Sequence, residues 1–288
     1  MATHRKLKAI FFDIDDTLYS TTVFAEKARR AAIDAMIAYG LKGDREELMR
    51  ELNEVIAEFT SNYEHHLDKL LLRIPHENLN GRNPAILVAA GVVAYHETKS
   101  RELRVYDDVY EVLRELTKSG LVMGIISAGL TVKQAEKIVR LKITEFLDPR
   151  AIFISDQIGI SKPNPKLYKK ACDAVGVDPK EAMYVGDHPT SDVEPTKRLG
   201  MVSVWMRRSG RHALESCPAK PDYQIRNFHE LRDVLVRDFG IELPLSGHLA
   251  TVDKKPGDKK SGDNKSGDNK SGDNKSDPEP AARAADDH

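Results

Sequence analysis

The sequence predicts an α/β fold with a doubly wound parallel sheet, and three observations lead to this prediction. Short unbroken apolar runs alternate with helical patterns in the second half of the chain, and such runs are typical of strands buried on both faces of a parallel sheet. A block of purely helical patterns separates the first apolar run from the others. A repetitive polar segment ends the chain. We therefore expect a doubly wound core, an inserted helical domain and a disordered tail.

Three carboxylates directly follow the first expected strand, Ala9 to Phe12. Asp13 and Asp15 are two residues apart, so their side chains leave the same face while the backbone stays extended. Their repulsion in apolar surroundings favours a bound cation or a retained proton. Mg2+ prefers carboxylate and phosphate oxygens, and a nucleophilic carboxylate beside a second acid could transfer a phosphoryl group. The alternative is a polar turn in which Asp13 or Asp16 caps backbone amides.

Length and charge restrict the classes of function. The 288 residues suffice for one large domain with an insertion or for two smaller domains, and a net charge of -1 gives no global attraction to nucleic acid or to an anionic membrane. No apolar run approaches the roughly 20 residues of a membrane span, and no signal-peptide pattern follows the basic start. Cys172 and Cys217 lack metal-ligand spacing, which fits a reduced, cytoplasmic setting.

Residues 20–99 show helical spacing of apolar side chains and no strand pattern, which predicts a small helical domain inserted after the first strand. Its four histidines have no acid or thiol at ligand spacing, so we interpret them as solvated or core-edge side chains: His65, His66, His76 and His96. The expected helices are Ala25 to Tyr39, Glu46 to Phe59, Tyr63 to Leu72 and Pro84 to Thr98.

Strands and helices alternate after Val105, so we assign residues 1–19 and 100–240 to one core domain. The expected strands are Leu121 to Ile126, Ala151 to Ile154, Met183 to Val185, Val202 to Met206 and, at an edge, Tyr223 to Arg226. The expected helices include Thr131 to Leu141, Ser191 to Leu199 and His229 to Phe239.

Residues 241–288 are expected to form a linker and a tail. Ser-Gly-Asp-Asn-Lys recurs in tandem from Ser261 to Lys275, without an aromatic or β-branched residue. Such a segment cannot bury enough surface to offset the entropy of ordering. We therefore predict a disordered, solvated tether rather than a docking segment.

Two further polar motifs follow expected strands and suit phosphate. Ser127-Ala128-Gly129 offers a hydroxyl and free backbone amides just before a helix, although an ordinary turn between strand and helix would look the same. Lys162 precedes Pro163-Asn164-Pro165, and a proline suits the first position of a helix. This predicts a lysine held on a stiff loop, whereas a solvated lysine is the alternative.

Asp187 follows Gly186, and a glycine there would let the backbone approach a ligand closely. Asp192 comes at an expected helix start, where it would interact with the helix dipole or lie in the outer shell of a metal. Ligands of doubly wound sheets bind at the carboxyl ends of the strands. We therefore expect four side chains to meet in one crevice: Asp13, Ser127, Lys162 and Asp187.

As a set, these motifs resemble those of the haloacid dehalogenase superfamily of phosphohydrolases, in the subgroup with a helical cap inserted after the first motif. The resemblance spans roughly Lys6 to Phe239. The motifs are Asp13-Ile14-Asp15-Asp16-Thr17, Ser127, Lys162 with Pro163 and Pro165, and Gly186-Asp187 with Asp192. The fourth motif departs from the family pattern at His188, Pro189, Ser191 and Glu194-Pro195-Thr196, which puts helix packing there in doubt.

The resemblance implies the superfamily's Rossmann-like core, Mg2+ as cofactor and an aspartyl-phosphate intermediate. It makes Asp13 the nucleophile and Asp15 the general acid/base. It places Mg2+ on Asp13, on the backbone carbonyl of Asp15 and on Asp187, with Asp192 in the metal site. The implied phosphate-binding residues are Thr17, Ser127, Ala128, Gly129 and Lys162.

Asp15 favours phosphate ester hydrolysis over dehalogenation, because displacing a halide needs no acid at that position. A phosphomutase with the same motifs stays open, and a non-enzymatic receiver-type phospho-acceptor is disfavoured by chain length and by the helical insertion. The resemblance to archaeal members of the subgroup implies a small phosphorylated metabolite such as glyceraldehyde 3-phosphate, with phosphoglycolate as rival. We expect neither a nucleic-acid nor a membrane partner, and a homodimer stays open.

Overall fold

The computed structural model describes residues 6–60, 62–208, 210 and 212–244. The predicted tail with its tandem repeats lies outside these residues. In the part of the chain that is described, no helix combines the length and the apolar character that a bilayer crossing requires.

The described residues form one parallel sheet whose strand order is β3-β2-β1-β4-β5-β6. The chain runs outward from β1 to one edge and then returns to continue on the other side, which confirms the predicted doubly wound sheet and the edge position of the last strand. The strands are β1 (Ala9–Phe12), β2 (Val122–Ser127), β3 (Ile152–Ile154), β4 (Ala182–Gly186), β5 (Val202–Met206) and β6 (Tyr223–Ile225).

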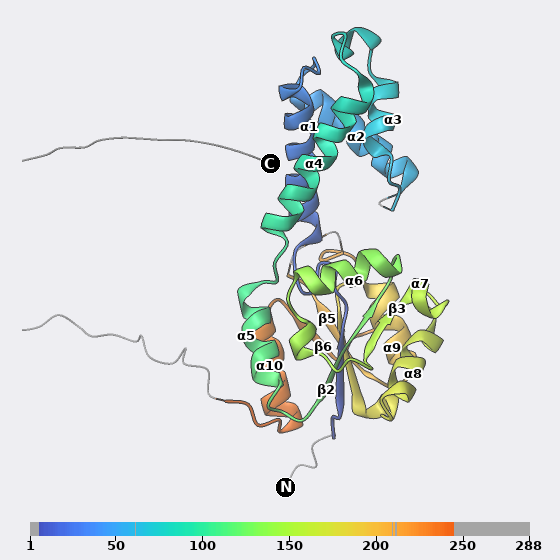
Figure 1. The fold of residues 1–288 in the computed structure, drawn as a ribbon. Helices are drawn as coiled ribbons and strands as arrows, with labels where there is room; N and C mark the ends of the chain where they lie inside the picture. Colours follow the sequence, from blue (N-terminus) through green and yellow to red (C-terminus); the bar gives the residue numbers. More distant parts are fainter. Residues whose placement is uncertain (1–5, 61, 209, 211, 245–288) are drawn as a thin grey trace, which may run out of the picture. The chain divides into compact units, whose positions relative to one another are not determined.

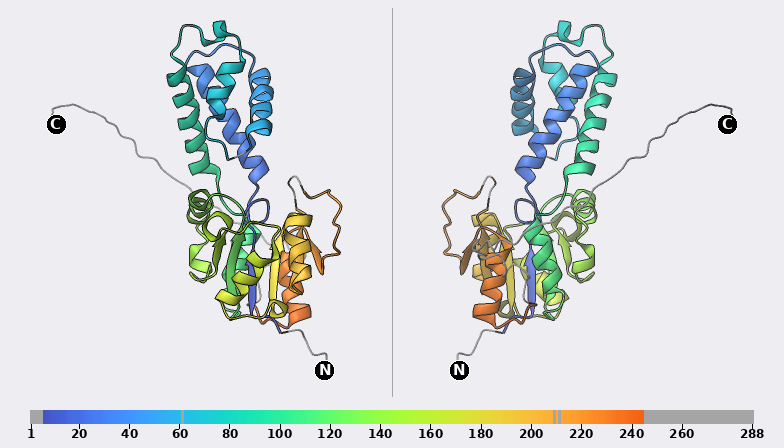
Figure 2. Two further views of the ribbon diagram at one scale, coloured as in Figure 1. Left: turned by 90° about the vertical axis from the view of Figure 1, so that its right-hand side faces the viewer. Right: turned by 90° about the vertical axis from the view of Figure 1, so that its left-hand side faces the viewer.

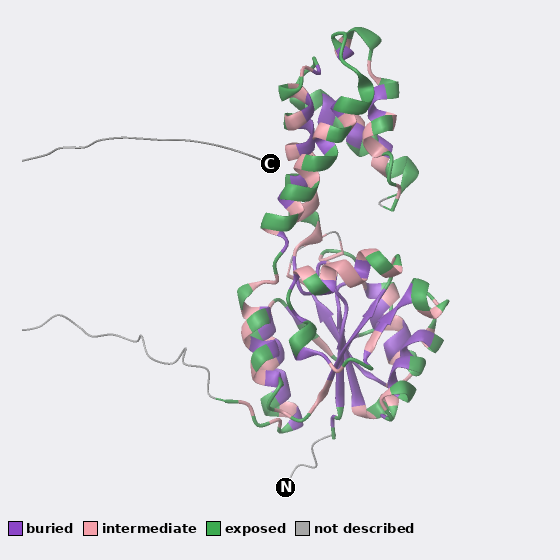
Figure 3. Ribbon diagram, in the orientation of Figure 1, coloured by how far each residue is buried: buried purple, intermediate pink, exposed green. Residues whose placement is uncertain are grey.

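Helices cover both faces of this sheet, as Figure 1 shows, with α5 and α10 on one side and α8 and α9 on the other. The strands between them are almost wholly buried (Figure 3). The helices are α5 (Asp107–Leu116), α6 (Thr131–Arg140), α7 (Ser155–Ile158), α8 (Pro165–Ala174), α9 (Glu194–Arg198) and α10 (Phe228–Phe239).

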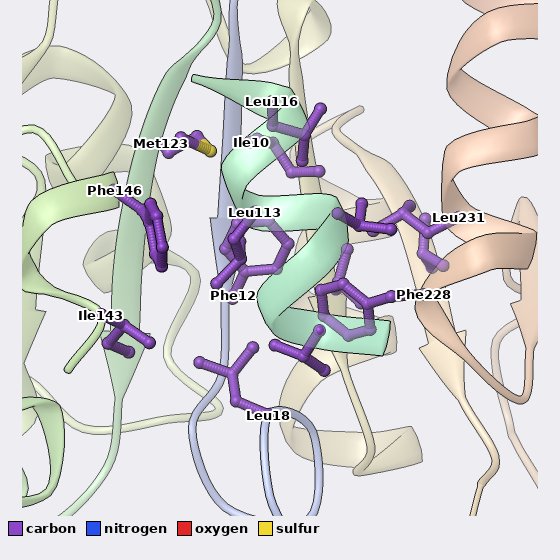
Figure 4. Packing of buried hydrophobic residues seen from close by; sticks show 14 of the residues in the cluster. Ile10, Phe12, Leu18, Leu113, Leu116, Met123, Ile143, Phe146, Phe228 and Leu231 are labelled. Carbon is purple, nitrogen blue, oxygen red and sulfur yellow. The ribbon is translucent and has the colours of Figure 1, made fainter. Parts of the chain in front are cut away.

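The side chains of β1 alternate between two apolar clusters, because successive residues of a strand point to opposite faces. Ile10 and Phe12 pack with α5 and α10, whereas Ala9 and Phe11 pack with α8. On the first face the rings of Phe12 and Phe228 stack with their centroids 5.7 Å apart. Figure 4 shows these side chains gathered between β1, α5 and α10. The continuous apolar run in the sequence therefore reflects burial on both faces.

Four helices lie between β1 and α5 and have an apolar cluster of their own, which includes Ile33, Leu52 and Leu87. Helices α1 and α4 run side by side in each view of Figures 1 and 2. The separate cluster supports the predicted division into core and helical cap, whose boundaries stay a prediction. The helices are α1 (Thr21–Ala38), α2 (Arg45–Phe59), α3 (His66–Arg73) and α4 (Pro84–Glu102).

The expected helix from Ser191 to Leu199 differs in the structure, because a π-helical turn, η4 (Pro189–Val193), precedes α9. Pro195 has no N–H to donate to the carbonyl of Ser191, so a regular α-helix cannot continue through it. The Tyr168 hydroxyl donates to that carbonyl instead. Asp192 consequently lies inside a π-helical turn and not at a regular helix start.

Truncating the buried face of α5 should test this packing. Leu113 is fully buried against β1, so Leu113→Ala should lower the free energy of unfolding by about 2–5 kcal/mol. The matched control is Val139→Ala on α6, where the side chain is 66% exposed and the expected change is within about 0.5 kcal/mol. Urea denaturation measures both, and equal losses at the two positions would contradict the packing described here.

Candidate active site

The predicted site residues lie at the carboxyl ends of three neighbouring strands. Asp13 directly follows β1, Asp187 directly follows β4 and Ser127 ends β2. Strands β1 and β4 pair with Phe12 opposite Val185, and the Asp13 N–H donates to the Val185 carbonyl at 2.9 Å. The hydrogen-bonded sheet therefore holds the first and fourth motifs side by side at the point where the strand order reverses.

Lys162 lies buried among these groups, with only 5% of its side chain exposed. Its ammonium donates to Asp13 Oδ1 at 2.7 Å and to Asp192 Oδ1 at 2.9 Å. A third bond joins it to the Tyr184 hydroxyl at 2.6 Å. Burial alone would lower the pKa of Lys162, but the charges of Asp13 and Asp192 raise that pKa well above its ordinary value. The lysine is therefore a fixed cation and not a solvated one.

The loop that carries Lys162 is held by the start of α8. Asn164 caps this helix by accepting a hydrogen bond from the Lys166 N–H at 3.0 Å, and Pro165 occupies its first turn. Proline fits there because its missing N–H is not needed for the helix. This local structure agrees with the stiff loop predicted from the sequence.

Three buried carboxylates, those of Asp13, Asp187 and Asp192, place an oxygen each within 4.8 Å of one another. Burial raises the pKa of Asp13 to about 6, although the Lys162 charge opposes the shift. Burial and the charges of Asp192 and Asp13 raise the pKa of Asp187 to about 9. One ammonium does not compensate these charges, and a cation among them would lower the cost of burying them.

The donor set fits Mg2+, which prefers carboxylate oxygens in small number. The Asp187 carboxylate accepts no hydrogen bond from any described residue, so it is available as a ligand. Asp192 differs, because Lys162 occupies its Oδ1 and the His188 N–H donates to its Oδ2 at 3.0 Å. This geometry agrees with an outer-shell place for Asp192, in which it orients the lysine and the loop after β4.

Gly186 is required for a different reason from the one expected. A Cβ atom at this position would overlap the Asp192 carboxylate. The close approach predicted for a ligand is therefore made by a side chain of the protein itself. Asp187 directly follows this glycine. Because Gly186 has no side chain, the carboxylate of Asp192 can lie close to that of Asp187 in one cluster.

Asp15 is held away from the acid cluster by several donors. Lys137 Nζ on α6 lies 2.7 Å from each of its two oxygens. Further donors are the Tyr19 hydroxyl at 2.6 Å, the Thr21 hydroxyl at 2.9 Å and Gln134 Nε2 at 3.2 Å. Burial alone would raise the pKa of Asp15, but the Lys137 charge and these hydrogen bonds lower it. The side chain of Asp15 thus lies outside the group of three possible ligands, although its backbone carbonyl stays a predicted ligand.

The sequence reasoning missed Gln134 and Lys137. Both lie on α6, the helix that begins soon after Ser127, and they are three positions apart, so they share one helical face. Their spacing on one helical face was visible in the sequence, but it does not show what they contact, because Asp15 lies more than 115 residues away.

Most of the residues expected to bind phosphate lie in and near the turn after β2, but no hydrogen bond between described residues connects Thr17 to that turn. Ser127 is buried, and its hydroxyl accepts a bond from Gln134 Nε2 at 3.1 Å. The expectation of a free amide at Gly129 is wrong, because that N–H donates to Ser155 Oγ at 3.0 Å. Thr17 is fully buried, and its hydroxyl has no hydrogen-bond partner among the described residues. A cleft of about 520 Å³ opens beside Ala128 and Gly129, but the cluster of Asp13, Asp187 and Asp192 does not line it.

The acid cluster should respond to Mg2+ and to pH in a defined direction. Asp187 has a pKa of about 9 in the folded protein and an ordinary value of 3.8. Between these values the folded state binds more protons than the unfolded one, so the free energy of unfolding falls as pH rises. Near pH 8 without metal, Asp187→Asn should melt at or above the temperature of the wild type. Mg2+ at about 100 times its Kd should raise the wild-type Tm by roughly 5–10 °C and the variant's Tm much less.

Differential scanning fluorimetry with and without Mg2+ measures both effects. The matched control is Asp173→Asn on α8, because Asp173 is exposed and pairs with Lys169. Asp173→Asn should show the wild-type Tm shift, and a shift of the same size in Asp187→Asn would contradict the proposed metal site.

Comparison with known proteins agrees with this geometry. Residues 10–206 match the haloacid dehalogenase-like hydrolase family. The glyceraldehyde 3-phosphate phosphatase of Methanopyrus kandleri is 45% identical over 234 residues, which cover 80% of this chain and 97% of that protein. The protein of the same name from Pyrococcus furiosus is 42% identical over 238 residues, which cover 82% of this chain and 96% of that protein.

Among solved structures, a HAD phosphatase from Thermococcus onnurineus has a TM-score of 0.56 and 25% identity, covering 80% of this chain and 98% of that one. A structure described as a putative beta-phosphoglucomutase from Thermotoga maritima has a TM-score of 0.58 at 20% identity, covering 80% of this chain and 100% of that one. The second likeness shows the fold alone. The match over residues 10–206 and the close relatives show that this chain belongs to the haloacid dehalogenase-like hydrolase family.

Proposed function

We propose that this protein is a Mg2+-dependent phosphoric monoester hydrolase that acts on a small phosphorylated metabolite through an aspartyl-phosphate. The observation that carries the proposal is the buried group of Asp13, Asp187 and Lys162 at the carboxyl ends of the central strands. The group combines a nucleophile, a fixed cation and ligands for a divalent ion. Relatives that are named phosphatases support this assignment.

Asp13 is the proposed nucleophile. The sheet fixes its backbone, and the Lys162 ammonium holds its Oδ1 at 2.7 Å, which orients the carboxylate for attack on phosphorus. Lys162 also supplies positive charge for the oxygens of a bound phosphoryl group. Asp192 and the Tyr184 hydroxyl keep that ammonium in place.

Asp15 is the proposed general acid/base. In the first half of the reaction it protonates the alkoxide that leaves as the phosphoryl group moves to Asp13. In the second half it accepts a proton from the water that hydrolyses the aspartyl-phosphate, and phosphate is released. Ser127, the turn to Gly129 and Thr17 complete the proposed phosphate site.

Asp13, the Asp15 carbonyl and Asp187 are the proposed ligands of Mg2+. When bound, the ion supplies positive charge that lowers the repulsion between the phosphate and the carboxylates. The unengaged Asp187 carboxylate supports this assignment most directly.

We propose glyceraldehyde 3-phosphate as the substrate to test first and phosphoglycolate as its rival, because five relatives that are 37–47% identical are named glyceraldehyde 3-phosphate phosphatases. The two free cysteines agree with a cytoplasmic enzyme. A phosphomutase would use the same acids, but it would retain the phosphoryl group in its product. Steady release of inorganic phosphate therefore separates the two activities.

Replacing the nucleophile should abolish turnover without unfolding the protein. Asp13→Asn keeps the size of the side chain but replaces the anionic carboxylate with a neutral, poorly nucleophilic amide, so kcat should fall at least about a thousandfold. Phosphate release from glyceraldehyde 3-phosphate with Mg2+ measures this, and circular dichroism monitors the fold. The control Asp173→Asn should retain wild-type kcat, and near-native activity of pure Asp13→Asn would refute the assignment.

The substrate assignment has its own measurement. On a panel of phosphorylated metabolites, kcat/KM should be highest for glyceraldehyde 3-phosphate, and chelation of Mg2+ with EDTA should remove the activity. A preference for phosphoglycolate would replace the substrate but keep the reaction. A single turnover without further phosphate release would indicate a phospho-acceptor and not a hydrolase.

A further inference from the structure

The side chain of Lys137 on α6 is directed at the carboxylate of Asp15. Its ammonium lies 2.7 Å from both oxygens of Asp15, and only 21% of its side chain is exposed. No other carboxylate pairs with it among the described residues. Holding both oxygens restrains the carboxylate about its Cβ–Cγ bond, which a single hydrogen bond would not do.

The donors to Asp15 differ in origin. Tyr19 and Thr21 lie four and six residues after Asp15 in the sequence, and Thr21 is the first residue of α1. Lys137 and Gln134 come from α6, more than 115 residues away in the sequence, at separations of 122 and 119. Among the described residues, these are the side-chain hydrogen bonds that connect Asp15 to a helix packed on the sheet, and they help to fix its carboxylate relative to the sheet.

Gln134 extends the connection to the expected phosphate site. Its buried Nε2 lies 3.2 Å from Asp15 Oδ2 and 3.1 Å from Ser127 Oγ. The same amide donates to the Ala128 carbonyl at 2.5 Å. One face of α6 thus holds the acid/base and the turn after β2 in a fixed relation.

We propose that Lys137, assisted by Gln134, is a positioning residue that aligns Asp15 with the oxygen of the leaving group. The inference rests on the proposed phosphatase function. In the step concerned, Asp15 acts in its protonated form. The bond between phosphorus and the leaving oxygen breaks as phosphorus bonds to Asp13, the proton of Asp15 moves to that oxygen, and the carboxylate that results is the form that pairs with Lys137. A misaligned Asp15 would transfer this proton poorly, while the nucleophile and the phosphate site would be unchanged.

The test uses two substrates that differ in their need for this proton. The leaving group of an alkyl phosphate such as glyceraldehyde 3-phosphate is a basic alkoxide, which needs the proton from Asp15. The leaving group of 4-nitrophenyl phosphate is a stabilised phenolate, which does not need that proton. Lys137→Met keeps much of the side-chain length and removes the charge. It should lower kcat/KM about 10- to 100-fold for the alkyl phosphate and less than about threefold for the aryl phosphate.

Three controls separate positioning from a structural role. Lys137→Arg can contact both oxygens and should recover at least about a third of the wild-type kcat/KM. Lys169→Met changes an exposed lysine on α8 in the same way and should leave both substrates unaffected. In an Asp15→Asn background, Lys137→Met should add less than a twofold loss, because the group that it positions is already absent.

The outcomes distinguish the inference from the function on which it rests. If the wild type and Asp13→Asn release phosphate at the same rate, the proposed function fails. If Asp13→Asn is inactive but Lys137→Met loses the same factor on both substrates, or loses nothing on the alkyl phosphate, the positioning role of Lys137 is wrong.

Discussion

The structure depends on one electrostatic constraint, which is the burial of three carboxylates around a single ammonium at the carboxyl edge of the sheet. Asp13, Asp187 and Asp192 repel one another, and Lys162 compensates only part of that charge. Several neighbouring features serve this cluster. The Tyr184 hydroxyl anchors the lysine, and the π-helical turn places Asp192 close enough to reach it. A cluster that is unstable alone is suited to bind a cation and a phosphate.

The doubly wound sheet brings the members of this cluster together. Strands β1 and β4 are neighbours although about 170 residues separate them, and the alternation of their side chains fills an apolar layer on each face. The rigid layers fix the strand ends, and short loops place the reactive groups there. The helical block between β1 and α5 has its own apolar cluster, so it can vary without disturbing the sheet.

Much of this architecture could be predicted because it depends on local patterns. Apolar runs such as Ala9 to Phe12 indicated buried strands, and Asn164-Pro165 indicated the start of α8. The contacts of Lys137 could not be predicted, because they join a helix to Asp15 across 122 residues and the lysine looks like any other on an amphipathic helix. The true reason for Gly186 was also hidden, since it depends on the side chain of Asp192. Local sequence determines the elements, whereas pairing between distant polar groups requires coordinates.

The proposed role of Asp13 as the nucleophile for phosphorus can be examined by trapping the phosphorylated enzyme. Acid quenching during turnover, followed by peptide mass spectrometry, detects an acyl-phosphate, which is stable in acid and is cleaved by hydroxylamine. We expect the added mass of one phosphoryl group on the peptide that contains Asp13, removed by hydroxylamine and absent from Asp13→Asn. A phosphoryl group found on another residue, or no adduct under conditions in which phosphate release shows a pre-steady-state burst, would contradict this role.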